Sequence, residues 1–354
     1  MRIWMRRILA AVLVMTLLLS GSAVSATELP ATEPTETVPE TAVATEATQP
    51  EETEPEETEP EETEPEETEP PAYVIDTESE IYGICDALAS EMEYDQLLVY
   101  DATGDEIIYA HSREGDKLYP ASVTKLFSAY VALQHLSPDD VITVGAERDL
   151  TKPGSSVAYI GKGQTLYVKH VIEGMMLPSG NDAAIILAAA AGRRIAEDET
   201  LEPVQAVETF VREMNRVADE LGFERSLFAN PDGWHMGCHY TCLNDMARIA
   251  KLALEDKTIS RYIRKSKDEV TFLSGHTVEW ENTNLLLNPE EGFYRGDAIG
   301  MKTGYTRQAE YCLMSAFKCK DGRQLVIGVF GYADEYQRFR DVITLAKACK
   351  ELLQ

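Results

Sequence analysis

Strand-like segments stand at both ends of the part of this chain that is able to fold, and a long helical region separates them. The strand patterns cover residues 96–101, 106–111, 298–303, 310–317 and 324–331. This order predicts one five-stranded antiparallel sheet whose strands come from both ends of the sequence. The expected fold class is therefore α+β, with helices flanking the sheet and a helical lobe inserted between its two groups of strands.

Apolar residues recur at helical spacing in six further segments. These predicted helices cover residues 78–93, 122–135, 182–191, 203–221, 242–255 and 334–353. We expect the first and the last of them to cover one face of the sheet. The remaining four would form the inserted lobe.

The composition changes abruptly at about residue 72. Residues 51–70 are four copies of Glu-Glu-Thr-Glu-Pro, and residues 27–80 contain 20 of the 61 acidic residues but no lysine or arginine. Such a segment cannot bury enough apolar surface to offset the entropy lost on ordering, so residues 27–72 are predicted to be a disordered spacer. The folded domain is then 73–354. Without a basic patch to neutralise phosphates, the chain is not expected to bind nucleic acid.

The first 26 residues have the pattern of an export signal. Arg2, Arg6 and Arg7 precede an apolar run, and Val24-Ser25-Ala26 fits the small-residue pattern of a cleavage site. The chain is therefore expected to be secreted and to act in the cell envelope. An alternative remains open, because the uncharged stretch 8–26 approaches the roughly 20 residues that span a bilayer, so an uncleaved signal could tether the protein to the membrane.

A serine and a lysine stand three residues apart at the start of the predicted helix 122–135. Ser122 would lie at the positive end of the helix, and Lys125 would fall on the same face one turn along. A partly desolvated lysine can have a lowered pKa and take the proton of the serine. A second Ser-x-x-Lys, Ser315 to Lys318, lies in a predicted strand. Residues i and i+3 of a strand face opposite sides, so we interpret it as structural.

Two more polar motifs follow in the sequence. Ser179-Gly-Asn181 precedes a helix, where it is either a helix cap or a second hydroxyl and an amide directed into a cleft. Lys302-Thr303-Gly304 lies on a predicted strand. A cation and a hydroxyl side by side suit a substrate carboxylate, and the glycine lets a ligand backbone approach closely. The alternative for this motif is an edge strand with a turn glycine.

The three motifs, in this order, resemble those of penicillin-binding proteins and serine β-lactamases. The longer strings Tyr-Pro-Ala-Ser-Val-Thr-Lys, Met-Leu-Pro-Ser-Gly-Asn-Asp-Ala-Ala and Gly-Met-Lys-Thr-Gly-Tyr-Thr are similar to those of the D-alanyl-D-alanine carboxypeptidases. The resemblance covers about residues 80–354. It implies a β-lactamase/DD-peptidase-like fold, which agrees with the order of strands and helices.

This resemblance also implies an activity. The protein would be a serine-type D-Ala-D-Ala carboxypeptidase that removes the terminal D-alanine from peptidoglycan stem pentapeptides through an acyl-enzyme. The implied catalytic residues are Ser122, Lys125, Ser179 and Asn181, and the implied substrate-binding residues are Lys302, Thr303, Gly304 and Tyr305. The backbone N–H groups of Ser122 and Tyr305 would form the oxyanion hole. β-Lactam antibiotics would be covalent inhibitors, and neither a metal nor another cofactor would be needed.

Two departures from the family pattern matter. Many relatives have a further β-rich domain and a C-terminal membrane anchor. Here the 50 residues after Gly304 are used by two strands and a helix, so a membrane tether is expected at the N-terminus. Glu310 stands where relatives usually have glycine, and we expect a local effect only.

His235, Cys238, His239 and Cys242 look at first like a metal site. Their spacing is too crowded for ordinary tetrahedral zinc, which usually takes two separated pairs of ligands. Structural packing is the preferred interpretation, and a local Cys238–Cys242 disulfide is left open.

Two rival functions were weighed against the carboxypeptidase. The best-known β-lactamases need a glutamate in a Glu-x-x-Leu-Asn segment between the second and third motifs, and no such string lies between Asn181 and Lys302. Slow β-lactam turnover is therefore expected. The presence of all the chemical residues argues against a non-catalytic wall-binding or sensing module. The balance between carboxypeptidase, endopeptidase and transpeptidase activity stays open.

Overall fold

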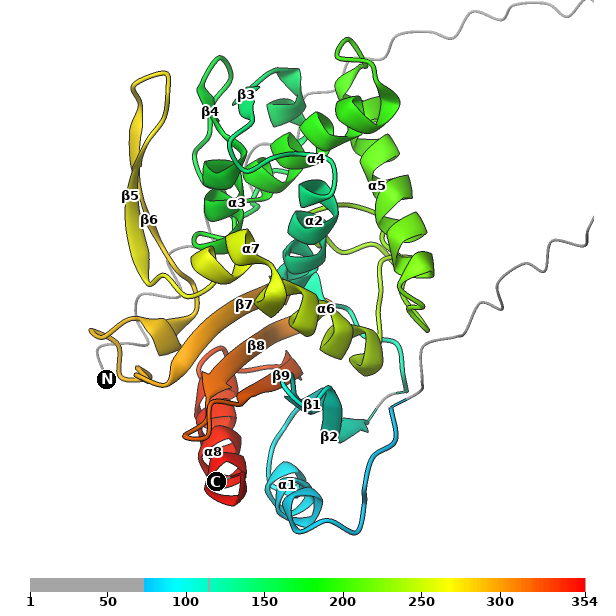
Figure 1. Cartoon of the computed structure of the whole chain (residues 1–354), viewed down its shortest axis with the longest axis vertical. Coiled ribbons are helices and arrows are strands. Elements are labelled where there is room, and N and C mark those ends of the chain that lie inside the picture. Colours follow the sequence, from blue (N-terminus) through cyan, green and yellow to red (C-terminus); the bar gives the residue numbers. More distant parts are fainter. Residues whose placement is uncertain (1–72, 114, 354) are drawn as a thin grey trace, which may run out of the picture. The chain divides into compact units, whose positions relative to one another are not determined.

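The computed structural model describes residues 73–113 and 115–353 (Figure 1). The predicted signal, 1–26, and the predicted spacer, 27–72, lie outside these described residues. Within the described ranges, no helix combines the length and the apolar character that crossing a membrane requires.

A five-stranded antiparallel sheet forms the centre of the described domain, as the sequence predicts. Its strands are β1 (Gln96–Asp101), β2 (Glu106–Ser112), β7 (Ala298–Thr306), β8 (Glu310–Lys318) and β9 (Gln324–Tyr332). Their order in the sheet is β2-β1-β9-β8-β7. The pairing of β1 with β9 therefore joins the N-terminal and C-terminal strands. The same order leaves β7 as an edge strand, whose outer backbone groups are not used by the sheet.

Helices α1 (Glu80–Ser90) and α8 (Gln337–Leu352) cover one face of this sheet (Figure 1). Successive side chains of a strand point to opposite faces, so β1 contributes to both sides of the sheet. Its Leu97 and Val99 pack with the residues of α1 and α8. Leu98 belongs to the hydrophobic core on the other face. The expectation that the terminal helices share one face is confirmed.

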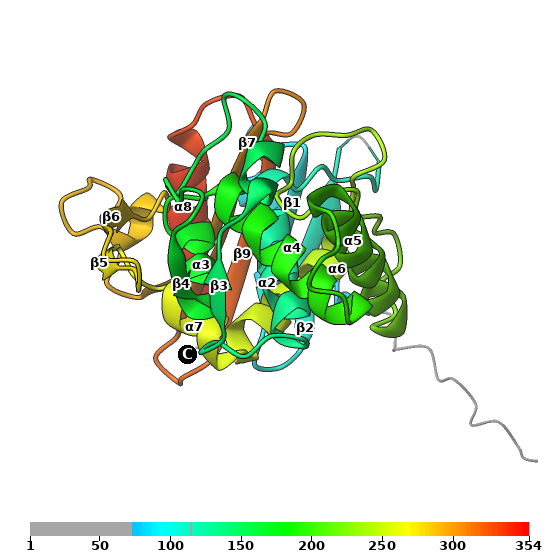
Figure 2. The same ribbon diagram turned by 90° about the horizontal axis from the view of Figure 1, so that it is seen from above.

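The inserted helical lobe covers the opposite face (Figures 1 and 2). It contains α2 (Thr124–Leu133), α3 (Val168–Met176), α4 (Asn181–Ala196), α5 (Pro203–Glu220), α6 (Leu243–Glu255) and α7 (Lys257–Tyr262). Helices α4 and α5 approach very closely, because a Cβ atom at Gly192 would lie 1.9 Å from the Ala206 carbonyl oxygen.

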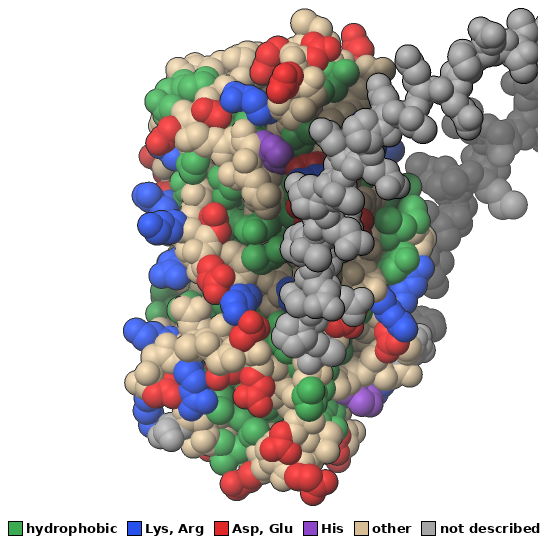
Figure 3. Space-filling model, turned by 45° about the vertical axis from the view of Figure 1, so that its right-hand side comes forward, with side chains coloured by type: hydrophobic (Ala, Val, Ile, Leu, Met, Phe, Trp, Pro, Cys, Tyr) green, Lys and Arg blue, Asp and Glu red, His purple; other side chains and the backbone are tan. Residues whose placement is uncertain are grey.

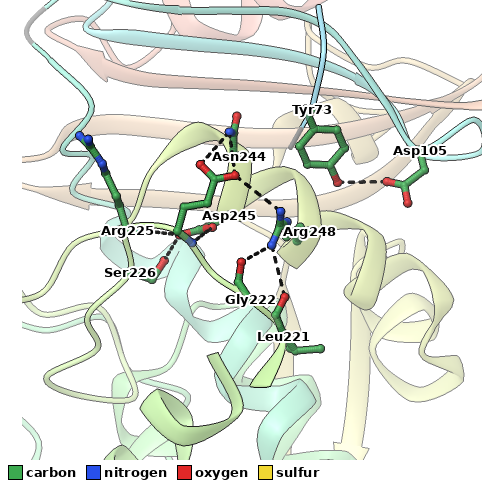
Figure 4. Close-up of polar contacts among 10 residues, drawn as sticks. Tyr73, Asp105, Leu221, Gly222, Arg225, Ser226, Asn244, Asp245 and Arg248 are labelled. Atoms are coloured by element: carbon green, nitrogen blue, oxygen red, sulfur yellow. Dashed lines mark hydrogen bonds and ion pairs between the residues drawn. The ribbon is translucent and has the colours of Figure 1, made fainter. Parts of the chain in front are cut away.

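Polar contacts fasten α6 to the loop that follows α5 (Figure 4). The Asp245 carboxylate accepts hydrogen bonds from the backbone N–H groups of Glu224 and Arg225, at 2.8 and 3.0 Å. Arg248 donates to the Leu221 carbonyl at 3.3 Å. The backbone groups of this irregular segment have no partner in a helix or a sheet, and these side chains supply the missing hydrogen bonds.

The sequence does not predict two small antiparallel strand pairs and two helices. The pairs are β3 (Val141–Thr143) with β4 (Thr165–Tyr167), and the hairpin of β5 (Lys267–Thr271) with β6 (Thr277–Glu281). The missed helices are α3 and α7. Three-residue strands contain too few side chains to show a period, and in β5 only Val270 is buried. The region predicted to be mostly helical therefore contains a short two-stranded sheet.

The second Ser-x-x-Lys has the structural role that its strand position predicts. Ser315 is buried and Lys318 is exposed, on opposite faces of β8. The Ser315 hydroxyl accepts a hydrogen bond from the Asn284 side-chain amide at 3.0 Å. At the start of the same strand, Glu310 has φ of 51°, in the left-handed region that favours glycine. This conformation is the local effect expected at that position.

Candidate active site

Ser122 lies in a tight 3₁₀ turn, Ala121–Val123, that leads directly into α2. Two glycines allow other segments to pack against this turn. A Cβ atom on Gly233 would lie 1.8 Å from the Ala121 carbonyl oxygen, and one on Gly304 would lie 3.2 Å from the Ser122 nitrogen. The first distance is impossible for a real side chain, so glycine is required at position 233, and the second is tighter than most Cβ contacts, so glycine favours the close approach of β7 to the serine.

The Lys125 amine is completely buried and touches three groups. Its Nζ atom lies 2.8 Å from Ser122 Oγ. It also donates to the side-chain oxygen of Asn181 at 2.8 Å and to the Asp232 carbonyl at 2.7 Å. A neutral amine has two N–H groups and one lone pair. The two carbonyl-type oxygens take the N–H groups, which leaves the lone pair for the proton of Ser122.

The environment of Lys125 makes its neutral form more accessible than that of an exposed lysine. Burial disfavours the ammonium and lowers the pKa of Lys125 to about 8, although the carboxylates of Asp232 and Asp182 act in the opposite direction. Near neutral pH the ammonium and the neutral amine are therefore both populated, as proton transfer to and from this group requires.

The segment before α4 brings a second hydroxyl to the same place. Ser179 has φ of 61°, an uncommon value for a residue other than glycine. Its side chain lines the same cleft as Ser122, and Asn181, the first residue of α4, reaches Lys125. Functional sites are where strained backbone is usually found, so this conformation supports the functional interpretation of Ser179-Gly-Asn181 over that of a simple cap.

Strand β7 supplies the third motif. Lys302 is buried and donates to the Thr303 carbonyl at 3.1 Å. Burial, together with the nearby cations Lys125 and Arg338, lowers the pKa of Lys302 well below its usual value. The Thr303 hydroxyl pairs with the Thr283 hydroxyl at 2.6 Å. A negatively charged ligand at this point would act as a counter-charge and stabilise the ammonium form of Lys302.

The motifs meet in one cleft of about 770 Å³. Its lining includes Ser122, Ser155, Ser156, Ser179, Asn181, Asp232, Trp234, Thr283, Thr303, Gly304, Tyr305, Arg307, Glu335 and Arg338. Tyr305 is 56% exposed at the rim. Lys125 and Lys302 are buried next to residues of this lining. The eight residues singled out from the sequence therefore come together at one place.

Three residues of the site were missed from the sequence. Asp232 provides the carbonyl oxygen that holds Lys125, Thr283 pairs with Thr303, and Arg338 donates to the Gly304 carbonyl at 3.2 Å. Asp232 lies in the turn sequence Asn-Pro-Asp-Gly, and Thr283 lies in Asn282-Thr-Asn; both strings resemble the family, but the sequence assigned no role to either residue. Arg338 has no motif around it, because its role depends on contacts with distant segments.

Of the set His235, Cys238, His239 and Cys242, His239 is buried and has a structural role. The ring of His239 uses both nitrogens: Nδ1 accepts from the Ala229 N–H at 3.1 Å, so Nε2 carries the proton and donates to the Thr124 hydroxyl at 2.8 Å. Burial lowers the pKa of His239 to about 4 and keeps the ring neutral. Cys238 and Cys242 are free thiols, so the local disulfide left open above is not formed in this structure.

The face of the molecule drawn in Figure 3 is of mixed charge. Acidic and basic side chains are interspersed over it. No continuous basic area is visible among the described residues on that face.

Comparisons with known proteins agree with this geometry. A family model described as D-alanyl-D-alanine carboxypeptidase matches residues 85–333. The curated D-alanyl-D-alanine carboxypeptidase DacF of Bacillus subtilis is 30% identical over 245 residues, which are 68% of this chain and 58% of that protein. DacC of Escherichia coli is 31% identical over 243 residues, 66% of this chain and 56% of that protein. The match thus spans little more than half the length of these two relatives.

A solved structure adds to these sequence matches. The crystal structure of the Streptomyces K15 DD-transpeptidase superposes with a TM-score of 0.64 and 26% sequence identity. The superposition covers 72% of this chain and 96% of that chain. The α+β architecture is therefore shared over almost the whole of the solved protein.

Proposed function

This chain belongs to the D-alanyl-D-alanine carboxypeptidase family, and from that premise we propose that it removes the terminal D-alanine from peptidoglycan stem pentapeptides through an acyl-enzyme on Ser122. The observation that carries the proposal is the Lys125 amine. It is buried, has a pKa lowered to about 8 and lies 2.8 Å from Ser122 Oγ. A nucleophile paired with a base in this way is the arrangement that covalent catalysis by serine requires.

In the acylation step, Ser122 Oγ attacks the carbonyl carbon of the D-Ala-D-Ala bond and its proton passes to Lys125 Nζ. The negative charge on the carbonyl oxygen is stabilised by the backbone N–H groups of Ser122 and Tyr305. Each such donor typically lowers the barrier by about 3 kcal/mol. Ser179 then relays a proton to the leaving amine of D-alanine, and Asn181 holds the substrate and the Lys125 amine in place. Water later releases the shortened peptide.

The substrate peptide lies along the free edge of β7. An extended peptide adds to such an edge through backbone hydrogen bonds, which fixes its direction. Its terminal carboxylate is bound by Lys302 and by the Thr303 hydroxyl. The cation Arg338, which lowers the pKa of Lys302, adds positive charge at the same end of the cleft. Gly304 allows the peptide backbone to come close to the strand.

The same site explains the partners and the location that we propose. β-Lactams would acylate Ser122, as they present an amide carbonyl next to a carboxylate. The substrate lies outside the cytoplasm, so the protein acts in the cell envelope after export through residues 1–26. Whether the signal is removed or kept as a tether is read from the N-terminus of the mature protein.

D-alanine release tests this proposal directly. Purified protein is incubated with a stem pentapeptide that ends in D-Ala-D-Ala, with and without an acceptor amine, and free D-alanine and products are measured. Hydrolysed tetrapeptide supports a carboxypeptidase, whereas a product joined to the amine supports a transpeptidase. Absence of release, together with absence of labelling by a fluorescent penicillin in a folded protein, would overturn the proposal.

The acylation rate is expected to rise with pH. Lys125 accepts the serine proton only when it is neutral, and its pKa is lowered to about 8. The second-order rate constant of acylation, which reports on the free enzyme, should therefore increase through a midpoint close to that value and level off above it. Stopped-flow measurements with a fluorescent penicillin check this expectation. A rate that is flat or falls over the same range contradicts the assignment of Lys125 as the base.

Replacing Lys302 by methionine is expected to raise KM for the pentapeptide by about 10- to 100-fold, because a hydrogen bond to a charged group is worth roughly 1.5–3 kcal/mol. A pentapeptide with a terminal carboxamide serves as the internal control. The K302M variant and the wild type should process the amidated peptide at similar, low rates. Equal loss on both peptides would argue that Lys302 does not bind the carboxylate.

A further inference from the structure

Asp182 follows the Ser179-Gly-Asn181 motif and has no part in the steps above. We propose that Asp182 is a positioning residue that clamps the cleft segment 156–160 to the start of α4 and thereby keeps Asn181 in contact with Lys125. This inference rests on the proposed function, because it concerns the same acylation step.

The Asp182 carboxylate is fully buried and binds a distant segment. Its Oδ1 atom accepts from the Ala158 N–H at 2.7 Å and from the neighbouring Ala183 N–H at 2.9 Å. Its Oδ2 atom accepts from the Ile160 N–H at 3.1 Å, and Arg148 lies 3.7 Å away. An acidic residue in the first turn of a helix is common, but an ordinary cap bonds to its own helix. Here two of the three N–H donors lie more than twenty residues earlier in the chain.

The conformation of segment 156–160 is adapted to this carboxylate. The N–H groups of residues 158 and 160 both point to the Asp182 carboxylate. The residue between them therefore has an uncommon, left-handed backbone conformation. Tyr159 has φ of 59° and is 75% exposed, so no packing of its ring accounts for the strain. A conformation of this kind persists only where surrounding contacts enforce it.

The clamped segment connects to the site on its other side. The Asn181 N–H donates to the Ser156 carbonyl at 2.8 Å, and Ser156 lines the cleft. A Cβ atom on Gly180 would lie 2.7 Å from the Ala158 Cβ atom, so the two segments are in direct contact. Loss of the clamp would therefore move Ser156 and Asn181 together, and with them one of the two acceptors of the Lys125 amine.

Asp182 also acts on Lys125 through its charge. The charged and titratable groups around Lys125 are Asp182 and Asp232, which favour the ammonium, and Lys302, which disfavours it. His239 is kept neutral by burial, and Arg148 partly balances Asp182. Removing the Asp182 charge and loosening the Asn181 acceptor both destabilise the ammonium. Both changes therefore shift the titration of Lys125 to lower pH, which a purely structural role would not do.

The test compares D182N with a matched control, D256N, in the full chain. Asp256 caps the N-terminus of α7 and accepts from the N–H groups of Thr258 and Ile259, both at 2.8 Å, so it is a partly buried carboxylate at a helix start outside the cleft. Acylation by a fluorescent penicillin is followed as a function of pH, and thermal unfolding is measured for each protein. For D182N we expect the plateau rate to fall about 10- to 100-fold, as for a misplaced catalytic group, and the pH midpoint to move to lower pH.

D256N should lose stability but keep both the plateau and the midpoint. If D182N does not fold, R148Q gives the second measurement: removing the cation leaves the Asp182 charge unbalanced, so the midpoint should move up. A D182N protein with the wild-type plateau and midpoint overturns the inference, as does a loss of rate with an unmoved midpoint. Failure of the wild type itself to be acylated would instead overturn the proposed function.

Discussion

Replacing Ser122 by alanine is expected to abolish both penicillin labelling and D-alanine release. The change removes only the oxygen that forms the acyl bond, and loss of a serine nucleophile typically lowers kcat by roughly 10⁵- to 10⁶-fold. Lys125 keeps its hydrogen bonds to Asn181 and to the Asp232 carbonyl, so the fold should be unaffected. Intact-protein mass spectrometry after incubation with a penicillin measures the result.

The second Ser-x-x-Lys provides the control for this variant. S315A removes a buried hydroxyl that accepts from Asn284, so it should lower the unfolding temperature but leave labelling unchanged. Labelling that survives in S122A and disappears in S315A would show that the wrong serine has been assigned.

Replacing Lys125 by methionine is expected to slow acylation by about 10²- to 10⁴-fold, the usual contribution of a positioned general base. Methionine fills much of the same space without the amine. It leaves the oxygen acceptors of Asn181 and Asp232 unpaired, which costs about 1–3 kcal/mol of stability for each buried group. It also removes the free-energy cost of burying a titratable amine. We therefore expect a folded protein, which circular dichroism and thermal unfolding would verify.

The pH profile distinguishes the role of Lys125 from a general loss of packing. The residual acylation of K125M should lack the rise near pH 8 that the wild-type lysine produces. K318M, at the exposed lysine of the second Ser-x-x-Lys, should match the wild type in rate and profile. A K125M variant that retains the wild-type rise would assign the titrating group elsewhere.

The order of the five central strands and of the longer helices could be predicted from the sequence because each of these elements has a periodic or continuous apolar pattern of its own. β1 is buried on both faces and β9 is a long apolar run, so both patterns are visible without knowledge of their neighbours. The antiparallel pair of β3 and β4 has no such signal, since three residues per strand are too few to show alternation. Its existence depends on the lobe that surrounds it.

The sequence by itself predicted Ser122 as the nucleophile and Lys125 as its base, because the two residues are one helical turn apart and local geometry brings them together. It also pointed to Ser179, Asn181 and Lys302 through short motifs, whose meeting in one cleft the packing then produced.

Only the tertiary structure decided what surrounds the Lys125 amine. Its two acceptors lie 56 and 107 residues along the chain, and no local pattern encodes contacts of that range. The same holds for Thr283 beside Thr303 and for the clamp of Asp182 on segment 156–160. The physical reason is that a buried polar group must find partners wherever packing brings them, and the partners are set by how helices and sheet close around the site.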